Sequence, residues 1–158
     1  MERAPIIVGL DGSPASMEAV RWAAWQSQET STPLHVLHAY PSEAAPAEQE
    51  KEFRSVHESW QRSRASRWLR DALDESPALP YRLRLVVAEG TLEQVLQDRL
   101  CPDGLLVLGA PAAEAIPTWC LGRAGCPVVL VPLRASLVPE QPLPDRASVG
   151  TRLSEALA

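Results

Sequence analysis

The chain has 158 residues, of which 46% are hydrophobic and 22% are charged, and its formal net charge is −5. This balance is typical of one soluble globular domain, and no stretch reaches the roughly 18 consecutive apolar residues that a membrane span needs. No block of Lys or Arg could follow a phosphate backbone, so we expect no nucleic-acid partner. The three cysteines, Cys101, Cys120 and Cys126, lack CxxC spacing, which argues against a zinc site or a disulfide framework and favours a reducing cytoplasm.

The first predicted unit is a strand that leads directly into a helix. Residues 5–10, PIIVGL, form a β-branched run that is too short for the hydrophobic region of a signal peptide. The turn DGSP ends this strand, and Ser13 can cap a helix whose first position is Pro14. We expect Arg21 and Gln28 to be free on the outer face of this helix. Its expected buried stripe comprises Met17, Val20, Ala23 and Ala24.

A second strand and a long helix follow. Residues 34–40, LHVLHAY, are predicted as a strand. The segment from about 47 to 75 is predicted as an amphipathic helix, or a broken pair of helices, that covers one face of the sheet. The expected apolar stripe of this segment consists of Phe53, Val56, Trp60, Leu69, Ala72 and Leu73.

The second half of the chain repeats the alternation of strand and helix. Residues 81–88 are predicted as a strand that starts exposed and ends buried, and Thr91 with Gln94 matches a capping box for the next helix. The apolar runs 105–108, LLVL, and 127–133, PVVLVPL, are predicted as further strands. We therefore expect a doubly wound α/β domain over 1–133, followed by a flexible, proline-containing tail over 134–158.

In a doubly wound sheet, ligands bind at the carboxyl ends of the strands where the strand order reverses. Asp11 is the sharpest candidate, because a carboxylate directly after a buried strand can accept hydrogen bonds from a ribose or a base, or hold a magnesium ion. The alternative is that Asp11 only caps the first helix together with Ser13. The candidate strand ends are Asp11-Gly12-Ser13, His38-Ala39-Tyr40, Glu89-Gly90 and Gly109-Ala110.

Histidine and tryptophan also stand out in the sequence. His35 and His38 alternate with apolar residues, and no nucleophile with an acidic partner can be placed beside them, so we expect packing or hydrogen bonding and no catalytic triad. The five tryptophans are expected in the core or at an interface. Trp22 and Trp25 lie off the main stripe of the first helix, and exposure of either would indicate a partner surface.

Five segments together resemble the universal stress protein family. They are IIVGLDGSPASMEAVRWAA, PLHVLHAY, VVAEGTLEQVLQ, DGLLVLGA and CPVVLVP, and the similarity spans about residues 5–133. The resemblance implies a five-stranded parallel sheet sandwiched by helices, the Rossmann-like arrangement of the adenine nucleotide alpha hydrolases. It also implies a homodimer formed through the last strand, Pro127 to Leu133. In the ATP-binding members the residues that match Asp11 and Ala39 hold the adenosine, and Gly12 and Ser13 lie in the same turn as candidate contacts.

The family's phosphate loop, written G-x2-G-x9-G-[S/T], directly follows the fourth strand, and this chain departs from it. In one register Gly109 is the first glycine, Ala112 replaces the second, Gly122 matches the third and Arg123 replaces the hydroxyl residue. In the register that we favour, IPTWCLGRAGCP is the crossover helix with its exit turn, and the glycine-rich loop is deleted.

Both registers have the same consequence for phosphate binding. Ala112 adds a Cβ where the loop needs glycine, and Pro111 and Pro117 each remove an amide donor. Arg123 and a helix N-terminus near Pro117 remain as contacts that could still attract a phosphate. We therefore expect polyphosphate binding to be weak or absent.

These observations predict a cytoplasmic regulatory or stress-response protein that acts as a dimeric binding module, with an unidentified protein partner and no required cofactor. The alternative is an ATP-binding universal stress protein that acts as a nucleotide-dependent switch, with ATP and magnesium at Asp11. An enzyme is not expected, because no nucleophile–base pair can be named on this scaffold, and weak ATP hydrolysis is the only activity considered.

Overall fold

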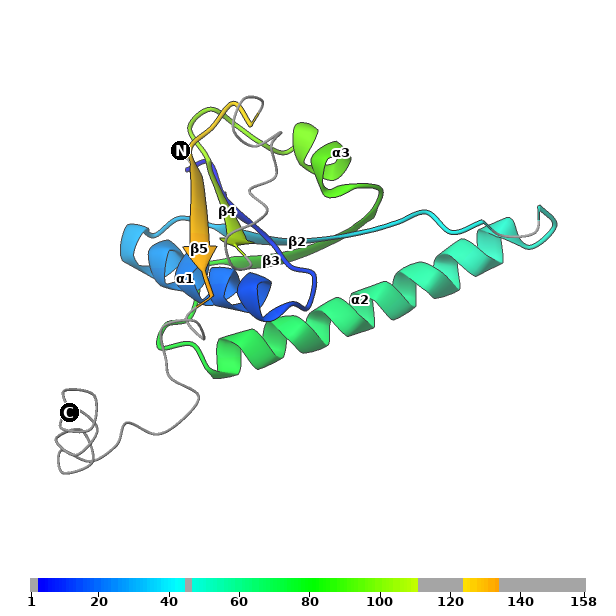
Figure 1. The fold of residues 1–158 in the computed structure, drawn as a ribbon, viewed down its shortest axis with the longest axis horizontal. Helices are drawn as coiled ribbons and strands as arrows, with labels where there is room; N and C mark the ends of the chain where they lie inside the picture. Colours follow the sequence, from blue (N-terminus) through cyan, green and yellow to red (C-terminus); the bar gives the residue numbers. More distant parts are fainter. Residues whose placement is uncertain (1–2, 45–46, 111–123, 134–158) are drawn as a thin grey trace, which may run out of the picture.

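The computed structural model describes residues 3–44, 47–110 and 124–133 (Figure 1). Its strands are β1 (Ile6–Gly9), β2 (Leu34–Tyr40), β3 (Leu83–Glu89), β4 (Leu105–Ala110) and β5 (Val128–Pro132). Its helices are α1 (Pro14–Thr30), α2 (Glu50–Asp74) and α3 (Leu92–Gln97). The five strands form one parallel sheet in the order β3-β2-β1-β4-β5, which confirms the predicted five-stranded α/β sheet.

The central strand β1 sets the switch point of the sheet. Ile6 of β1 pairs with Leu34 of β2 on one side and with Leu105 of β4 on the other. The chain therefore runs outward to β3 on one side before it crosses to β4 and β5 on the other. Because the order reverses between β1 and β4, the crevice at the carboxyl ends of these two strands is where a ligand is expected.

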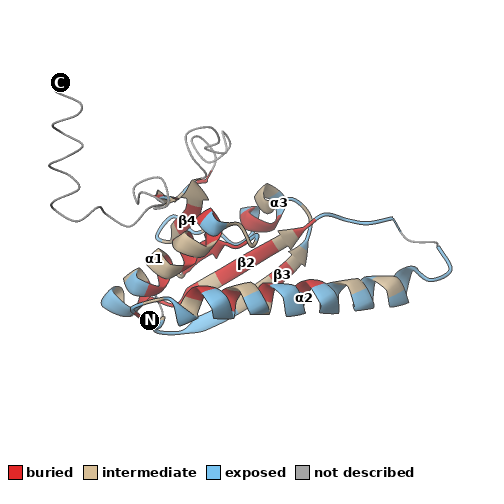
Figure 2. Cartoon of the chain, turned by 60° about the horizontal axis from the view of Figure 1, so that its bottom comes forward, coloured by how far each residue is buried: buried red, intermediate tan, exposed pale blue. Residues whose placement is uncertain are grey.

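Each face of the sheet carries its own core, because successive side chains of a strand point to opposite faces. Ile6 and Val8 of β1 pack in one cluster with Val20 of α1 and Leu69 of α2. Ile7 packs in the other cluster, which includes Leu96 of α3. Helices α1 and α2 thus cover one face and α3 lies on the other, with the buried strands between them (Figures 1 and 2).

The long segment between β2 and β3 is a single helix, and its predicted stripe is only partly right. Leu69 and Ala72 are buried as expected, but Val56 is 65% exposed and Trp60 is 55% exposed. A 25-residue helix is about 37 Å long, whereas the seven-residue strands that it crosses span about 23 Å. The first turns of α2 therefore extend past the ends of the strands, where they have no sheet to cover (Figure 1), whereas Gln61 still lies against β2.

The outer face of α1 also differs from the prediction at Arg21. Gln28 is exposed, but the guanidinium of Arg21 is fully engaged rather than free. It donates to Glu18 at 2.6 Å, to Glu75 at 2.9 Å and to the carbonyl oxygen of Ala72 at 3.1 Å. The two acceptors at the end of α2 are distant in sequence, so no local pattern could have revealed them.

The remaining predicted strand bounds agree with the described residues within one or two positions at the ends, whereas Trp25 and Trp60 are exposed and not in the core. Strand β2 has the predicted bounds, and α1 begins at Pro14 with Ser13 as its N-cap. Thr91 and Gln94 form the predicted capping box of α3. Strands β1 and β5 are slightly shorter than the apolar runs that predicted them, and the tail at 134–158 lies outside the described residues. None of the described helices is long and apolar enough to cross a membrane.

Candidate functional site

The turn between β1 and α1 is held by a closed network of short hydrogen bonds. The Asp11 carboxylate accepts from the backbone N–H of Ser13 at 2.8 Å. The Ser13 hydroxyl oxygen accepts from the Ser16 N–H at 3.2 Å, and the Ser16 hydroxyl donates to the Ser13 carbonyl at 2.9 Å. Gly12 joins these residues with φ +82°, a conformation that L residues rarely adopt. The predicted capping role of the turn is thereby confirmed, and the carboxylate is held in one orientation.

The same network governs the charge of Asp11. Partial burial acts to raise its pKa, but hydrogen bonds from the side chain and backbone of Ser13 and from the side chain of Ser16 outweigh that effect. The pKa of Asp11 therefore lies below its ordinary value of 3.8. At neutral pH the group is a carboxylate at the C-terminal end of β1.

Gly109, at the end of β4, makes a close contact with the start of α1. A Cβ on this residue would lie 2.4 Å from the carbonyl carbon and oxygen of Ala15 and 2.7 Å from the Ser16 nitrogen. No atom in a protein tolerates such an approach, so only glycine lets β4 pass this close to the helix. A structural need therefore accounts for Gly109, whether or not the residue also contacts a ligand.

A pocket of about 360 Å³ opens at the carboxyl ends of β1, β2 and β4. It brings together four of the predicted site residues, Asp11, Ser13, Ala39 and Gly109. Its other lining residues are Gly9, Leu10, Ser16, Leu37, Leu92 and Leu108. The volume lies within the range typical of small-molecule sites, and the lining is mostly apolar with a few polar groups from one turn.

Sequence analysis did not name Ser16, Leu92 or Leu108 as site residues. Each had a signal: Ser16 lies in the first turn of the predicted helix, Leu92 follows the capping Thr91, and Leu108 precedes Gly109. The sequence did not show that α3, on the face of the sheet opposite α1, contributes to the same pocket as the end of β1. Strand–helix alternation does not specify that meeting.

His38 and Ala39 are neighbours in β2 with different environments. His38 is buried, with Nδ1 donating to the carbonyl oxygen of Leu10 at 2.9 Å and Nε2 lying 3.0 Å from the side-chain amide of Gln61. This confirms the predicted packing and hydrogen-bonding role of His38. Ala39 points to the other face and lines the pocket.

Other predicted positions are not brought to the pocket. Tyr40 and Glu89-Gly90 are not among its lining residues, although the Gly90 N–H donates to the Tyr40 carbonyl at 2.8 Å. Burial, with Glu58 and Glu89 nearby, raises the pKa of Tyr40. Both registers of the phosphate loop, including Gly122 and Arg123, concern residues outside the described part of the chain.

Size alone does not single out this pocket. Three other depressions formed by the described residues have volumes of about 490, 500 and 720 Å³. The last two lie near the amino ends of the strands, where doubly wound proteins do not bind their ligands. Within 3–44, 47–110 and 124–133, no group of three or more His, Cys, Asp or Glu side chains could hold a metal ion.

A parallel sheet of this order, with a pocket at the β1–β4 switch point, defines a Rossmann-like α/β protein. The family model described as the universal stress protein family matches residues 2–102. The chain belongs to the universal stress protein family.

Two universal stress proteins from Mycobacterium tuberculosis strains are similar over most of the sequence. Each is 30% identical over 157 residues, covering 91% of this chain and 52% of the relative. The chain thus spans about half the length of these curated relatives.

Solved structures share the fold at lower sequence identity. The universal stress protein UspA from Lactobacillus plantarum aligns with a TM-score of 0.58 and 16% identity, over 83% of this chain and 99% of that one. A universal stress protein family member from Arabidopsis thaliana with AMP bound has a TM-score of 0.58 and 16% identity, over 87% and 97%. A universal stress protein in complex with cAMP has a TM-score of 0.51 and 17% identity, over 84% and 99%.

Proposed function

We propose that this chain is a regulatory binding protein that acts as a dimer and whose strand-end pocket binds triphosphates weakly or not at all. The observation that carries the proposal is the chemical character of the pocket lining. Asp11 is the one ionisable residue among the ten lining residues, and Lys, Arg and His are absent from that described set. The rest of the lining supplies two serine hydroxyls, backbone and apolar groups.

This lining disfavours a polyphosphate on electrostatic grounds. Asp11 is ionised at neutral pH, since its pKa is lowered by the bonds within the turn. A phosphate charge about 4 Å away would be repelled by roughly 1–4 kcal/mol, depending on how far water screens the pair. A triphosphate site normally overcomes such repulsion with cations or with a ring of glycine-supported amides. The substitutions at Ala112, Pro111 and Pro117 weaken the second means as well.

The same lining suits an uncharged, ring-shaped ligand with hydroxyl groups. Leu10, Leu37 and Leu92 offer apolar surface for a ring, and the Asp11 carboxylate can accept hydrogen bonds from hydroxyl or amino groups. A nucleoside, or a mononucleotide whose phosphate stays in solvent, meets this description. The family members solved with AMP and with cAMP make adenine derivatives the first ligands to try.

Calorimetric titration of the full chain with adenosine, AMP, and ATP with magnesium tests the proposal. We expect affinity to stay level or fall as phosphates are added, and Asp11→Ala to abolish whatever adenosine binding is measured. Asp71→Ala is the matched control, because it removes an exposed carboxylate from α2, outside the pocket. Micromolar binding of ATP with magnesium that Asp11→Ala abolishes would contradict the proposal.

That contrary result would support the second candidate, a nucleotide-dependent switch. The observation in its favour is that Asp11 and Ala39, which match the adenosine-holding positions of ATP-binding members, line the same pocket. The two candidates differ in where the binding energy lies. The switch requires the γ-phosphate to strengthen binding, whereas the binding module requires it to contribute nothing.

The dimer is proposed through β5, at one edge of the sheet. Edge strands present unpaired backbone groups, and β5 carries the apolar sequence VVLVP. Sedimentation of the full chain should give a dimer mass. Hydrogen exchange should slow with rising concentration at Val128 to Val131 but not at β3, the opposite edge. A monomer at all concentrations would refute the dimer.

A further inference from the structure

The outer side of α2 carries two large apolar side chains that the fold does not bury. Val56 and Trp60 are both exposed, and they lie one turn apart on the side of the helix that faces away from its buried positions. Figure 2 shows exposed residues along this side of the helix. Neighbouring apolar side chains on an open helix face indicate a surface that contacts another molecule.

The indole ring of Trp60 is ordered before any association. The ring of His57 stacks on it, with the centroids 6.1 Å apart, and Phe53 stacks on the other side of His57 at 5.8 Å. The Arg64 guanidinium lies 5.0 Å from the Trp60 ring centroid. Because these contacts already restrict the ring, little side-chain entropy remains to be lost when Trp60 binds a partner.

The surface stripe that contains Val56 and Trp60 changes in character along the helix. It is acidic near the start of α2, apolar and small in the middle, and basic towards the end. Its exposed members, at helical spacing, are Glu52, Val56, Ser59, Trp60, Ser63 and Arg67. Among the ion pairs of the described residues, none involves Glu52 or Arg67. Both charges of the stripe are therefore available to a partner.

A stripe of this kind is complementary to a second copy of itself that runs in the opposite direction. Glu52 lies eight positions before Trp60 and Arg67 lies seven positions after it, so a two-fold axis beside Trp60 would bring Glu52 of each copy opposite Arg67 of the other. Val56 would in the same way meet the small Ser63, and the two Trp60 rings would meet each other near the axis.

The other charges of α2 do not oppose this pairing at its centre. Arg70 follows Arg67 on the stripe and offers Glu52 a second cation. Asp71 and Asp74 lie beyond it, where they would face Glu48 before the helix, at a rim where water and salt screen the repulsion. The helical spacing directs the remaining charged side chains near the centre away from the stripe; these are Lys51, Arg54, Glu58 and Arg62.

We propose that α2 pairs in antiparallel orientation with α2 of a second copy of this chain, through the stripe from Glu52 to Arg67. The stripe is about 22 Å long. A contact of this size lies at the small end of specific interfaces, so it forms at a higher concentration than the dimer proposed through β5.

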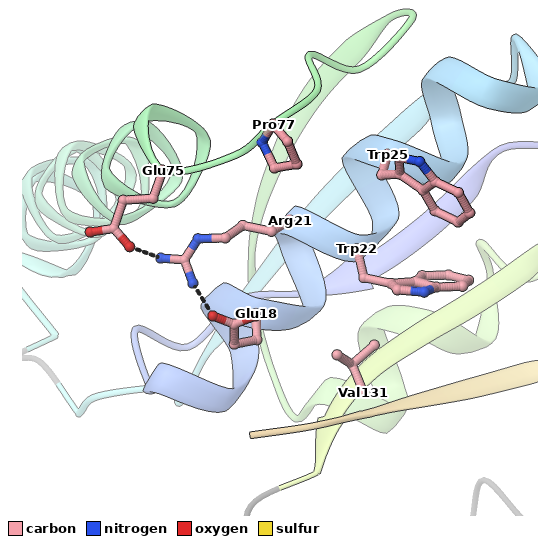
Figure 3. A pocket seen from close by; sticks show the side chains of 7 residues that line it. All are labelled: Glu18, Arg21, Trp22, Trp25, Glu75, Pro77 and Val131. Carbon is pink, nitrogen blue, oxygen red and sulfur yellow. Dashed lines mark hydrogen bonds and ion pairs between the residues drawn. The ribbon is translucent and has the colours of Figure 1, made fainter. Parts of the chain in front are cut away.

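The α2 contact and the β5 contact are independent surfaces. Figure 3 shows α1 between them, with Glu75 at the end of α2 on one side of α1 and Val131 of β5 on the other. A chain with two such two-fold contacts assembles beyond the dimer. The α2 contact also does not depend on what the strand-end pocket binds, because none of its residues lines that pocket.

Site-specific photo-crosslinking of the full chain gives a direct test. The photoreactive residue p-benzoylphenylalanine replaces Val56, and the covalent dimers formed on irradiation are mapped by mass spectrometry. We expect the probe to join the second chain near Ser63 of α2. The same probe in place of Arg62, which is exposed on the same helix but off the stripe, is the matched control and should give no adduct between two α2 helices.

Sedimentation of the full chain over a range of concentrations gives a second test. Trp60→Ser should remove the species larger than the β5 dimer. Glu52→Arg should weaken their formation about tenfold, because each reversed charge acts twice across the two-fold axis. Adding Arg67→Glu to that variant should restore most of the association. Glu58→Arg makes the same change of charge off the stripe and should have no effect. An unchanged circular dichroism spectrum shows that each variant is folded.

Three results would overturn the proposal. The first is that Trp60→Ser and the unmodified chain sediment alike at every concentration. The second is that the probe at position 56 reacts only within its own chain or with a part of the second chain outside α2. The third is that it reacts only when cell lysate is added, and then with a different protein. Failure of the β5 dimer alone would be distinguishable, since the α2 pair would remain as a dimer that Trp60→Ser dissociates.

Discussion

Gly12 lies directly against the indole ring of Trp68. A Cβ built on Gly12 would lie 2.3 Å from Cε2 of Trp68, and the backbone there has φ +82°. The ring is also held from other directions, by an edge contact with His38 at 5.3 Å and by the Arg64 guanidinium 4.6 Å from its centroid. The turn between β1 and α1 therefore packs against α2 through the contact between Gly12 and Trp68.

We predict that Gly12→Ala destabilises the fold by roughly 2–4 kcal/mol, because it combines a strained φ with a clash against a ring that cannot easily move. Urea unfolding followed by circular dichroism measures the loss. Gly125→Ala is the control, since Gly125 also has a positive φ, +66°, but no atom lies within 4 Å of its Cβ position. It should cost only about 1 kcal/mol. Equal losses in the two variants would show that the Trp68 contact is unimportant.

Gly109→Ala should cost about 3 kcal/mol, since its Cβ would meet backbone atoms of Ala15 that only a shift of α1 could relieve. Gly9→Ala is a close comparison, because both glycines line the strand-end pocket. The nearest atom to a Cβ at Gly9 is the Leu108 Cδ2 at 3.2 Å, the mobile end of a side chain. The melting temperature of Gly109→Ala should therefore be well below that of Gly9→Ala. The reverse order of melting temperatures would contradict the packing described for β4.

Arg21→Ala should lower the free energy of unfolding by about 1–2 kcal/mol, because it leaves the partly buried carbonyl oxygen of Ala72 without its donor and also removes the ion pair with the exposed Glu75. Arg54→Ala removes an ion pair with Glu50 on the exposed surface of α2, where Arg54 is 60% exposed. That variant should change stability by less than about 0.5 kcal/mol. The two urea midpoints give the comparison, and a neutral Arg21→Ala would mean that α1 and α2 do not depend on this bridge.

The charge of Asp11 predicts a pH dependence. Because its folded pKa lies below 3.8, the ionised group stabilises the fold above that pH, and the contribution is lost as the pH falls through the folded value. Asp11→Asn keeps the acceptor but not the charge. The unmodified chain should therefore have a larger free energy of unfolding than Asp11→Asn near pH 7, by less than about 1 kcal/mol at this exposed position. This difference should disappear in acid.

Unfolding midpoints measured from about pH 7 down to about pH 3 provide the test. In a Ser13→Ala background the gap should narrow, since the Ser13 side chain is one of the donors that lower the pKa. A gap that widens in acid would show that the pKa of Asp11 is raised rather than lowered.

The limits of sequence-based prediction are clearest in α2. Its buried positions are Gln61, Ala65, Leu69 and Ala72, a helical spacing that holds one polar and two small residues. The larger Val56 and Trp60 attracted the prediction but are exposed, Trp60 because it points away from the face on which the adjacent Gln61 is buried. Gln61 is buried with its side-chain amide 3.0 Å from Nε2 of His38, so each polar group has a partner in the interior. The hydrophobic pattern of one helix cannot show where the neighbouring sheet ends or which polar side chain of the sheet the helix packs against.

By itself, the sequence determined the order and type of the elements, the caps of α1 and α3, and the parallel sheet with Asp11 at a strand end. Those features depend on interactions within a few residues and on the period of buried side chains. Only the tertiary structure decided that Asp11, Ala39 and Gly109 share one pocket with Leu92, that Arg21 bridges two helices, and that Gly12 must stay a glycine beneath Trp68. These depend on the distance between segments far apart in the chain, which the packing of the whole domain sets.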